Sequence, residues 1–254
     1  KMKIVINWNK KIVIFILLVV FIGGLVIGDK WGNSIPVLNE RLVPIYKVNV
    51  PEKNIAITLD GTWGADNTEK LLNIFDKHNI KVTFFFAGYW LKKYPDLVQK
   101  IALAGHEVEN HTYTHPHCTK LSADKITEEL EKTSKLINDL IGKNPKLFRP
   151  PFGDYNNLVI ETARNLGYEV VQWSIDSLDW QEPGVDFIVK RVLENVSAGD
   201  IILMHNNAPD TPEALDILIP KLKEKGYNLV PLSELIYQKD YIIHPHNGLQ
   251  EKRG

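Results

Sequence analysis

The chain has 254 residues, with 30 Lys or Arg against 31 Asp or Glu and a formal net charge of −1. This length suits one sizeable domain, and the balanced charge excludes both the basic surface of a nucleic-acid-binding protein and a long acidic tail. The single cysteine, Cys118, excludes an intramolecular disulfide framework, and we interpret it as a buried thiol rather than as a metal ligand. We therefore expect one folded domain that is monomeric and binds no nucleic acid.

The first thirty residues have the pattern of an export signal. Residues 12–27 form an almost unbroken apolar run that follows four lysines and no acidic residue. This arrangement keeps the N-terminus in the cytoplasm and exports the rest of the chain. Val26-Ile27-Gly28 is a poor cleavage site, so we expect an anchor at the outer face of the cytoplasmic membrane, with a cleaved signal and a secreted protein as the alternative. A buried core helix does not fit, because the run has no polar face.

From residue 51 the chain alternates short apolar runs with amphipathic segments. The runs typical of strands cover residues 55–59, 82–86, 147–148, 170–173, 201–204 and 229–230, with a further strand leading into residues 109–111. Helical spacing of apolar residues is found over 68–78, 97–104, 122–141, 158–166, 187–196 and 215–225. Several of these segments stop at or shortly before a glycine. This order predicts a parallel α/β architecture, either closed as a barrel or open.

The segments on either side of this alternation have no sustained period. Glycine and proline interrupt residues 29–50, which we interpret as a stalk. The C-terminal tail is expected to be loose, with His244 and His246 at its surface. The predicted organisation is a cytoplasmic N-terminus (1–11), a signal anchor or signal peptide (12–28), a stalk (29–50), an α/β domain (51–238) and a tail (239–254).

Residues suited to catalysis follow several of the predicted strands. His111 and His115 are four residues apart, and on one helical turn two imidazoles at this spacing can bind one divalent cation. Other polar residues lie at or just beyond the end of an apolar run, where catalytic groups gather in parallel α/β folds: Asp60, Arg149, Asp176, Asp179 and His205. Nucleophile-elbow, phosphate-loop and dinucleotide motifs are absent from the sequence. The pattern therefore favours hydrolysis by a metal-bound water.

Such a hydrolase needs a base that takes a proton from water and an acid that protonates the leaving group. Asp60 suits the base, with Arg149 keeping it ionised, and His205 suits the acid, with Asp179 orienting its ring. Each residue also has a purely structural explanation, such as the capping of a turn by Asp60. We assign Asp176 to structural support.

Five short motifs occur in a fixed order along the chain. They are Thr58-Leu59-Asp60, His111-Thr112-Tyr113-Thr114-His115, Arg149-Pro150-Pro151-Phe152-Gly153, Asp176-Ser177-Leu178-Asp179-Trp180 and Leu203-Met204-His205. Together they resemble the motifs of the polysaccharide deacetylase family, the NodB-homology group or carbohydrate esterase family 4. The resemblance runs from Pro51 to Tyr237, and within the family the sequence is most similar to the sporulation-type deacetylases. The resemblance implies that residues 51–238 are a deacetylase domain.

The resemblance implies a distorted (β/α) barrel that removes N-acetyl groups from the N-acetylglucosamine or N-acetylmuramic acid of cell-wall glycan, such as peptidoglycan. A link to sporulation follows only by analogy. Residue by residue, Asp60 matches the catalytic base and Arg149 the residue that supports it. His205 matches the acid and Asp179 its partner.

The remaining motif positions match the metal and the substrate. His111 and His115 match two ligands of a divalent cation, which we expect to be zinc, with cobalt or nickel as alternatives. The backbone at Phe152 would help to form the oxyanion hole. Trp180 and Leu203 match the walls of the acetyl pocket, whereas we expect the neighbouring Trp173 to belong to the core.

One position departs from the family pattern. Gly61 stands where the family has a second aspartate that completes an Asp-His-His metal site. The loss of this ligand predicts weaker metal binding and an extra position for water or substrate. Asp66 is nearby, but its place at the start of a helix favours N-capping. Asn206, where an aspartate often follows the last histidine, is a milder change.

The sequence leaves three functions open. The first is a metal-assisted amidohydrolase that deacetylates wall glycan outside the cytoplasmic membrane. The second is a degenerate member of the family that binds glycan without hydrolysing it. The metal ligand missing at Gly61 supports this hypothesis. The third is an O-acetyl esterase, because ester and amide hydrolysis share a tetrahedral intermediate.

Overall fold

The computed structural model describes residues 41–254. The predicted cytoplasmic N-terminus, the anchor and most of the stalk fall on residues 1–40 and lie outside the described residues. Residues Leu42–Gly254 form one compact unit. Within the described residues, every helix is too short or too polar to cross a membrane.

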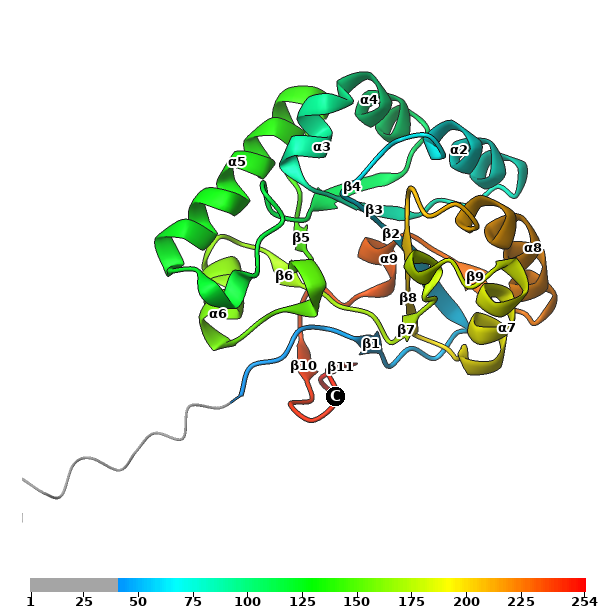
Figure 1. Cartoon of the computed structure of the whole chain (residues 1–254). Coiled ribbons are helices and arrows are strands. Elements are labelled where there is room, and N and C mark those ends of the chain that lie inside the picture. The colour runs from blue at the N-terminus through cyan, green and yellow to red at the C-terminus, as the bar shows by residue number, and fades with distance from the viewer. Residues whose placement is uncertain (1–40) are drawn as a thin grey trace, which may run out of the picture. The chain divides into compact units, whose positions relative to one another are not determined.

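A parallel sheet forms the centre of this unit, with seven strands in the order β6-β5-β4-β3-β2-β8-β7 and an eighth, β9, paired with one end of β2 (Figure 1). The strands are β2 (Asn54–Gly61), β3 (Thr83–Phe86), β4 (Glu107–Asn110), β5 (Leu147–Phe148), β6 (Glu169–Val170), β7 (Ile175–Asp176), β8 (Ile201–His205) and β9 (Asn228–Leu229). Each neighbouring pair in this sheet is parallel. The parallel α/β prediction is confirmed.

The sheet is a curled half-barrel rather than a closed barrel. Its two edge strands, β6 and β7, are not paired with each other in the described chain. The segment before β2 lies at this opening, where Ile45 bridges to Val171 and Lys47 bridges to Asp200. The distorted barrel expected from the family resemblance is therefore open on one side.

Helices cover the outer face of the curled sheet (Figure 1). They are α2 (Thr68–Lys77), α3 (Gly88–Lys93), α4 (Pro95–Leu103), α5 (Ala123–Ile141), α6 (Asn157–Asn165), α7 (Val185–Asn195) and α8 (Thr211–Glu224), whereas the short α9 (Leu232–Leu235) packs inside the curl. The longest, α5, begins and ends as its sequence predicts, because the Ser122 side chain accepts a hydrogen bond from the Lys125 amide and Gly142 adopts a left-handed φ of 70°.

The alternation of side chains along β2 separates the core from the site. Ile55, Ile57 and Leu59 are fully or almost fully buried in the cluster between the sheet and the helices. Ala56 belongs to a second cluster inside the curl. Because successive side chains of a strand point to opposite faces, Asp60 continues the face of Ala56 and reaches the interior of the half-barrel at the end of the strand.

Residues 42–50 and the C-terminal tail belong to the folded unit, which corrects the predicted stalk and loose tail. β1 (Lys47–Val48) pairs in parallel with β11 (Leu249–Lys252), and β11 pairs antiparallel with β10 (Tyr241–Ile243). Ile45, Val48 and Gln250 are fully buried. Two-residue strands between prolines give too short a pattern to be recognised in a sequence.

Candidate active site

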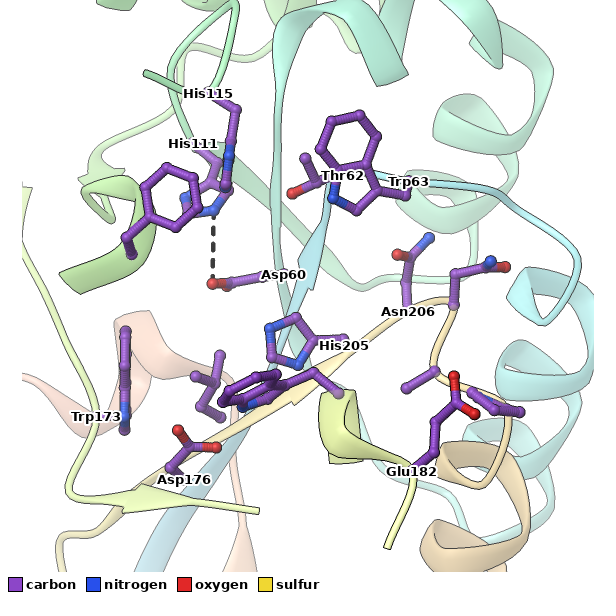
Figure 2. A pocket seen from close by; sticks show the side chains of 16 residues that line it. Asp60, Thr62, Trp63, His111, His115, Trp173, Asp176, Glu182, His205 and Asn206 are labelled. Carbon is purple, nitrogen blue, oxygen red and sulfur yellow. Dashed lines mark ion pairs between the residues drawn. The ribbon is translucent and has the colours of Figure 1, made fainter. Parts of the chain in front are cut away.

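The carboxyl ends of β2, β4 and β8 border a pocket of about 660 Å³ (Figure 2). The predicted site residues that line it are Asp60, His111, His115, Phe152, Trp180, Leu203 and His205. Asp179 and Arg149, the other two, are fully buried and contact the pocket residues from behind. The structure therefore gathers residues from all five sequence motifs around one cavity.

Asp60 is held by a buried arginine. Nη1 of Arg149 donates to Asp60 Oδ1 at 2.7 Å, and Nη2 donates to Thr58 Oγ1 at 2.9 Å and to the carbonyl oxygen of Gln172 at 3.2 Å. Burial opposes ionisation of Asp60, but the charges of Arg149 and His205 outweigh it and hold the pKa of this carboxyl below its usual value. Asp60 is thus an ionised carboxylate, and its second oxygen, Oδ2, lies 3.5 Å from Nε2 of His111.

His205 is paired with Asp179 on the neighbouring wall. Nδ1 of His205 lies 2.8 Å from Asp179 Oδ1, while Asp179 Oδ2 accepts from the His205 amide at 2.7 Å and from the Thr211 hydroxyl at 2.5 Å. Burial lowers the pKa of His205, but the hydrogen bond and charge of Asp179 more than offset this and raise it. The ring is therefore suited to donate a proton. Thr211 was missed in the sequence because Thr211-Pro212 looks only like the start of a helix.

The two histidines of the second motif lie on a loop, not on a helical turn as their spacing suggested. Thr112 and His115 have left-handed φ values of 66° and 57°, and the two imidazole rings are 4.9 Å apart. Nδ1 of His111 lies 2.7 Å from the carbonyl oxygen of Arg149 and donates to it, and because burial lowers the pKa of this ring, its Nε2 is left unprotonated. From α5, Glu129 accepts hydrogen bonds from two of the three loop amides between the histidines, those of Tyr113 and Thr114. No pattern in the sequence indicates this contact.

The family resemblance implies a divalent metal, which the side chains around the two histidines would have to hold. Burial lowers the pKa of His115 to about 3, so the ring is neutral, as a metal ligand must be. However, nowhere in residues 41–254 do three His, Cys, Asp or Glu side chains form a group that could hold a metal ion. Catalytic zinc usually has three protein ligands. The residues present therefore do not fit the three-ligand site of the family.

Gly61 is required by packing. A Cβ atom built at Gly61 would lie 2.1 Å from Cδ1 and 2.2 Å from Cε1 of Phe86. The Phe86 ring is fully buried and stacks on Trp90 at a centroid distance of 4.0 Å, so it has no free space to move into. A side chain at position 61 would thus point away from β2 on the face opposite Asp60, into the space that the Phe86 ring already fills.

Asp66 does not replace the missing ligand. It is exposed and does not line the pocket. The predicted N-capping role is also wrong, because the residue at the N-cap of α2 is Asn67 and no side-chain cap hydrogen bond is formed there. Asn206 is buried at the pocket wall.

Aromatic side chains form much of the remaining lining. Phe152 has a left-handed φ of 60° and is 61% exposed, with its ring stacked on His117 at 4.4 Å. Trp180 is also exposed, whereas Leu203 is almost fully buried. Trp173, which we expected in the core, is half-buried and lines the pocket, with its ring 5.7 Å from Cζ of Arg149.

Two residues confirm smaller predictions. Cys118 is a free, buried thiol, and burial raises its pKa to about 12, which makes it an inert packing residue. Asp176 accepts a hydrogen bond from the Leu178 amide at 2.9 Å, and it also lines the pocket. Its support of the turn that precedes Asp179 agrees with a structural role.

Comparison with known proteins places this site in a family. The family model described as polysaccharide deacetylase matches residues 47–171. A peptidoglycan-N-acetylglucosamine deacetylase of Bacillus cereus is 36% identical over 71% of this chain and 67% of its own length. The peptidoglycan-N-acetylmuramic acid deacetylase PdaA of Bacillus subtilis is 32% identical over 82% of this chain and 81% of its own length. The uncharacterized protein YlxY of Bacillus subtilis is 41% identical over 76% of this chain, which spans 60% of that protein.

Solved structures include relatives described as pseudoenzymes. Wild-type BA3943 of Bacillus anthracis, a CE4 family pseudoenzyme, matches with a TM-score of 0.74 and 33% identity over 84% of this chain and 73% of its own. A BA3943 mutant with restored enzymatic activity matches with the same TM-score and 37% identity, over 76% of this chain and 71% of that one. Relatives with the same fold therefore include both peptidoglycan deacetylases and a protein described as lacking activity. By sequence and by fold, this chain belongs to the polysaccharide deacetylase family.

Proposed function

We propose that this pocket binds the N-acetylated sugars of cell-wall glycan and that the chain acts as a glycan-binding member of its family, without metal-dependent turnover. One observation supports the absence of metal-dependent turnover. The side chain that would be the third metal ligand is absent at Gly61, and the Phe86 ring fills the space its Cβ would need. The relatives support the binding of N-acetylated wall sugars, because two of them are peptidoglycan deacetylases.

The residues that line the pocket suit an acetamido group. Leu203 and Trp180 provide apolar contact for the acetyl methyl group. The ionised Asp60 can accept a hydrogen bond from the amide N–H, and His205 can donate one to the carbonyl oxygen. A pocket with apolar walls and a few fixed polar groups is typical of small-ligand recognition.

N-deacetylation is the second candidate, and a specific observation favours it. Both proton-transfer groups are retained with their partners, as the Asp60–Arg149 pair at 2.7 Å and the His205–Asp179 pair at 2.8 Å. In that reaction Asp60 would take a proton from the attacking water and His205 would give one to the leaving amine. O-acetyl ester hydrolysis is the easier variant, because an alkoxide leaves more readily than an unprotonated amide nitrogen, so the ester depends less on proton donation by His205.

We also propose that the chain is exported, monomeric and held at the outer face of the cytoplasmic membrane through residues 12–28, where peptidoglycan is within reach. The apolar run and the preceding lysines support this proposal. A role in sporulation rests on resemblance alone. Fusing a reporter that is active only outside the cytoplasm to the C-terminus tests the orientation, and an inactive reporter in stable, full-length fusions would contradict it.

The decisive experiment measures binding and acetate release side by side. The full chain is incubated with peptidoglycan, with N-acetylglucosamine oligomers and with an O-acetylated glycan, with added Zn²⁺ or Co²⁺ and with chelator. We expect oligomer binding without acetate release from the amide substrates. Metal-dependent release that Asp60→Asn abolishes would instead establish the deacetylase, and release from the ester alone would establish the esterase. A folded chain that binds none of these glycans would contradict the proposal.

A further inference from the structure

The exposed aromatic side chains of the described chain gather at the pocket. Residues 41–254 have four such side chains, and three of them, Trp63, Phe152 and Trp180, line this one cavity. Trp63 is the most exposed, at 69%, and it lies outside the five motifs that identify the family. Exposed apolar groups concentrated around one site indicate a surface that a ligand covers.

The turn that carries Trp63 is fixed in place. The carbonyl oxygen of Gly64 accepts hydrogen bonds from the indole of Trp90 at 2.6 Å and from the side chain of Asn206 at 3.3 Å. The amide of Asp66 donates to the side chain of Asn207 at 3.1 Å. These contacts tie the turn after β2 to the loop after β8, so the turn is already ordered before a ligand arrives.

The indole itself is supported on one side and open on the other. Its ring lies 5.6 Å from the ring of Tyr89, tilted by 40°, and 6.4 Å from the ring of His115 in an edge arrangement. Figure 2 shows Trp63 and Trp173 on opposite sides of Asp60 and His205 in this view. The indole therefore extends the pocket beyond the acetyl-binding residues, on the side of the loop after β8.

We propose that Trp63 is a sugar-stacking residue that recognises a second sugar of the glycan chain, next to the acetamido sugar held between Asp60 and His205. This inference rests on the proposed function. One face of a pyranose ring presents C–H groups, whereas its hydroxyls point outward from the edge, so an exposed indole can cover the face while nearby polar groups meet the edge. Asn207 lines the pocket beside Trp63 and provides such a group. The preferred ligand is thus an amino-sugar oligomer rather than a single sugar.

Isothermal titration of the full chain with N-acetylglucosamine and its oligomers of two to five sugars tests this inference. In the wild-type protein the affinity should rise with chain length. Trp63→Ala should weaken binding of the tetramer about tenfold, in line with the usual strength of an aromatic contact, and leave binding of the monomer unchanged. Trp63→Phe, which keeps an aromatic ring, should restore most of the affinity.

Phe187 provides the matched control. It is 45% exposed on α7 and does not line the pocket, so Phe187→Ala removes an exposed ring elsewhere. Unchanged oligomer binding in Phe187→Ala, together with the length-dependent loss in Trp63→Ala, would support the inference. Wild-type tetramer affinity in a folded Trp63→Ala protein would overturn it while leaving glycan binding intact. If the wild-type chain binds no oligomer of any length, both the inference and the proposed function fail.

Discussion

At the scale of single residues, Arg149 organises the interior of the half-barrel. Its guanidinium is fully buried and donates to Asp60, Thr58 and the backbone of Gln172. Its Cζ also lies 4.2 Å from the centre of the Phe85 ring. An arginine in this position is stable only because a carboxylate and several acceptors replace its hydration.

Removing this guanidinium should therefore destabilise the folded chain strongly. We expect Arg149→Gln to lower the free energy of unfolding by about 3–5 kcal/mol, because Asp60 is left as an unpaired buried charge. Urea titration at pH 7 measures the change. Lys190→Gln, an exposed residue on α7, should cost no more than about 0.5 kcal/mol. An equally small loss in Arg149→Gln would show that water reaches Asp60.

Gly61 supports a prediction about reversion to the family pattern. Gly61→Asp should lower the melting temperature and should not increase Zn²⁺ affinity, because its Cβ meets the Phe86 ring. Phe86→Val should restore stability in the double variant. Valine ends at Cγ, and the Cγ atom of Phe86 is already at an ordinary contact distance of 3.4 Å from that Cβ. Thermal unfolding and Zn²⁺ titration provide the measurements.

The neighbouring Phe84 gives the control for this pair. It lies on the same strand, is fully buried and stacks on Phe86, but it is not among the atoms that a Cβ at Gly61 would meet. Phe84→Val should therefore not rescue Gly61→Asp. A Gly61→Asp protein that is stable and binds Zn²⁺ at least tenfold more tightly than wild type would contradict the packing argument.

His106 makes stability depend on pH. Burial, and then Lys81, lowers the pKa of His106 to about 4, while its Nδ1 accepts a hydrogen bond from the Val82 amide. Because the folded-state pKa lies below the usual 6.5, the unfolded chain binds the proton first, and stability falls as the pH drops from about 6.5 to 4. The loss should reach at most about 3 kcal/mol.

His106→Asn tests this dependence, because asparagine keeps an acceptor for the Val82 amide but does not titrate. Denaturation at pH 7 and pH 5 should show a smaller loss of stability in the variant than in the wild-type chain. Equal losses in the two proteins would assign the pH dependence to other groups.

At the scale of elements, α5 controls the loop that carries both histidines. Glu129 accepts from the amides of Tyr113 and Thr114 at 2.8 and 2.7 Å and from the Thr114 hydroxyl at 2.9 Å. These bonds hold a loop in which Thr112 and His115 have left-handed backbone angles. The orientation of the two imidazoles thus depends on a carboxylate from a neighbouring helix.

Glu129→Ala should therefore loosen this loop without unfolding α5. We expect a loss of about 1–3 kcal/mol from the three bonds, and new exchange broadening of the His115 ring signals in NMR spectra. Glu128→Ala is a matched control, because Glu128 is one residue away on the same helix and pairs only with exposed lysines. Unchanged His115 signals in Glu129→Ala would show that the loop is held by other contacts.

The elements that sequence analysis predicted are those with long periodic patterns or clear caps, such as α5 between Ser122 and Gly142 and the buried strand β2. The motif residues also converged as expected, because the carboxyl ends of parallel strands meet at one edge of a sheet. The six-residue helix α3 and strands β1, β10 and β11 were not predicted, since each is too short to show a period.

The unpredicted parts of the site depend on contacts between distant segments. Thr211 reaches Asp179 across 32 positions, and Phe86 excludes a side chain at Gly61 from the next strand. Neither contact leaves a local pattern in the sequence. The open half-barrel was likewise not predictable from apolar periodicity, which gives strands but not whether the first and last of them pair.

At the scale of the whole folded unit, the C-terminal strands close the sheet that contains β1. The side chain of Gln250 is fully buried and exchanges two hydrogen bonds with the backbone of Tyr237, at 2.9 and 2.7 Å. Removing residues 239–254 would uncover Val48 and leave these backbone groups unpaired. We expect the melting temperature to fall by at least about 5 °C, since 1 kcal/mol is worth some 2–4 °C in a domain of this size.

Differential scanning calorimetry of the truncated chain measures this change. A chain that ends at Lys252 keeps β11 and serves as the control, and its melting temperature should be close to that of the wild-type protein. An unchanged melting temperature after removal of residues 239–254 would contradict this prediction, because it would mean that the tail makes no net contribution to the stability of the unit.

The parallel pairing of β1 with β11 also constrains when the protein can finish folding. Lys47 pairs with Leu249, a separation of 249 − 47 = 202 residues. During synthesis the first strand emerges from the ribosome long before its partner is made, and closing so distant a contact is slow. Val48 therefore stays in contact with water until β11 has been made. The folded unit therefore remains incomplete for nearly the whole time in which residues 42–254 are synthesised.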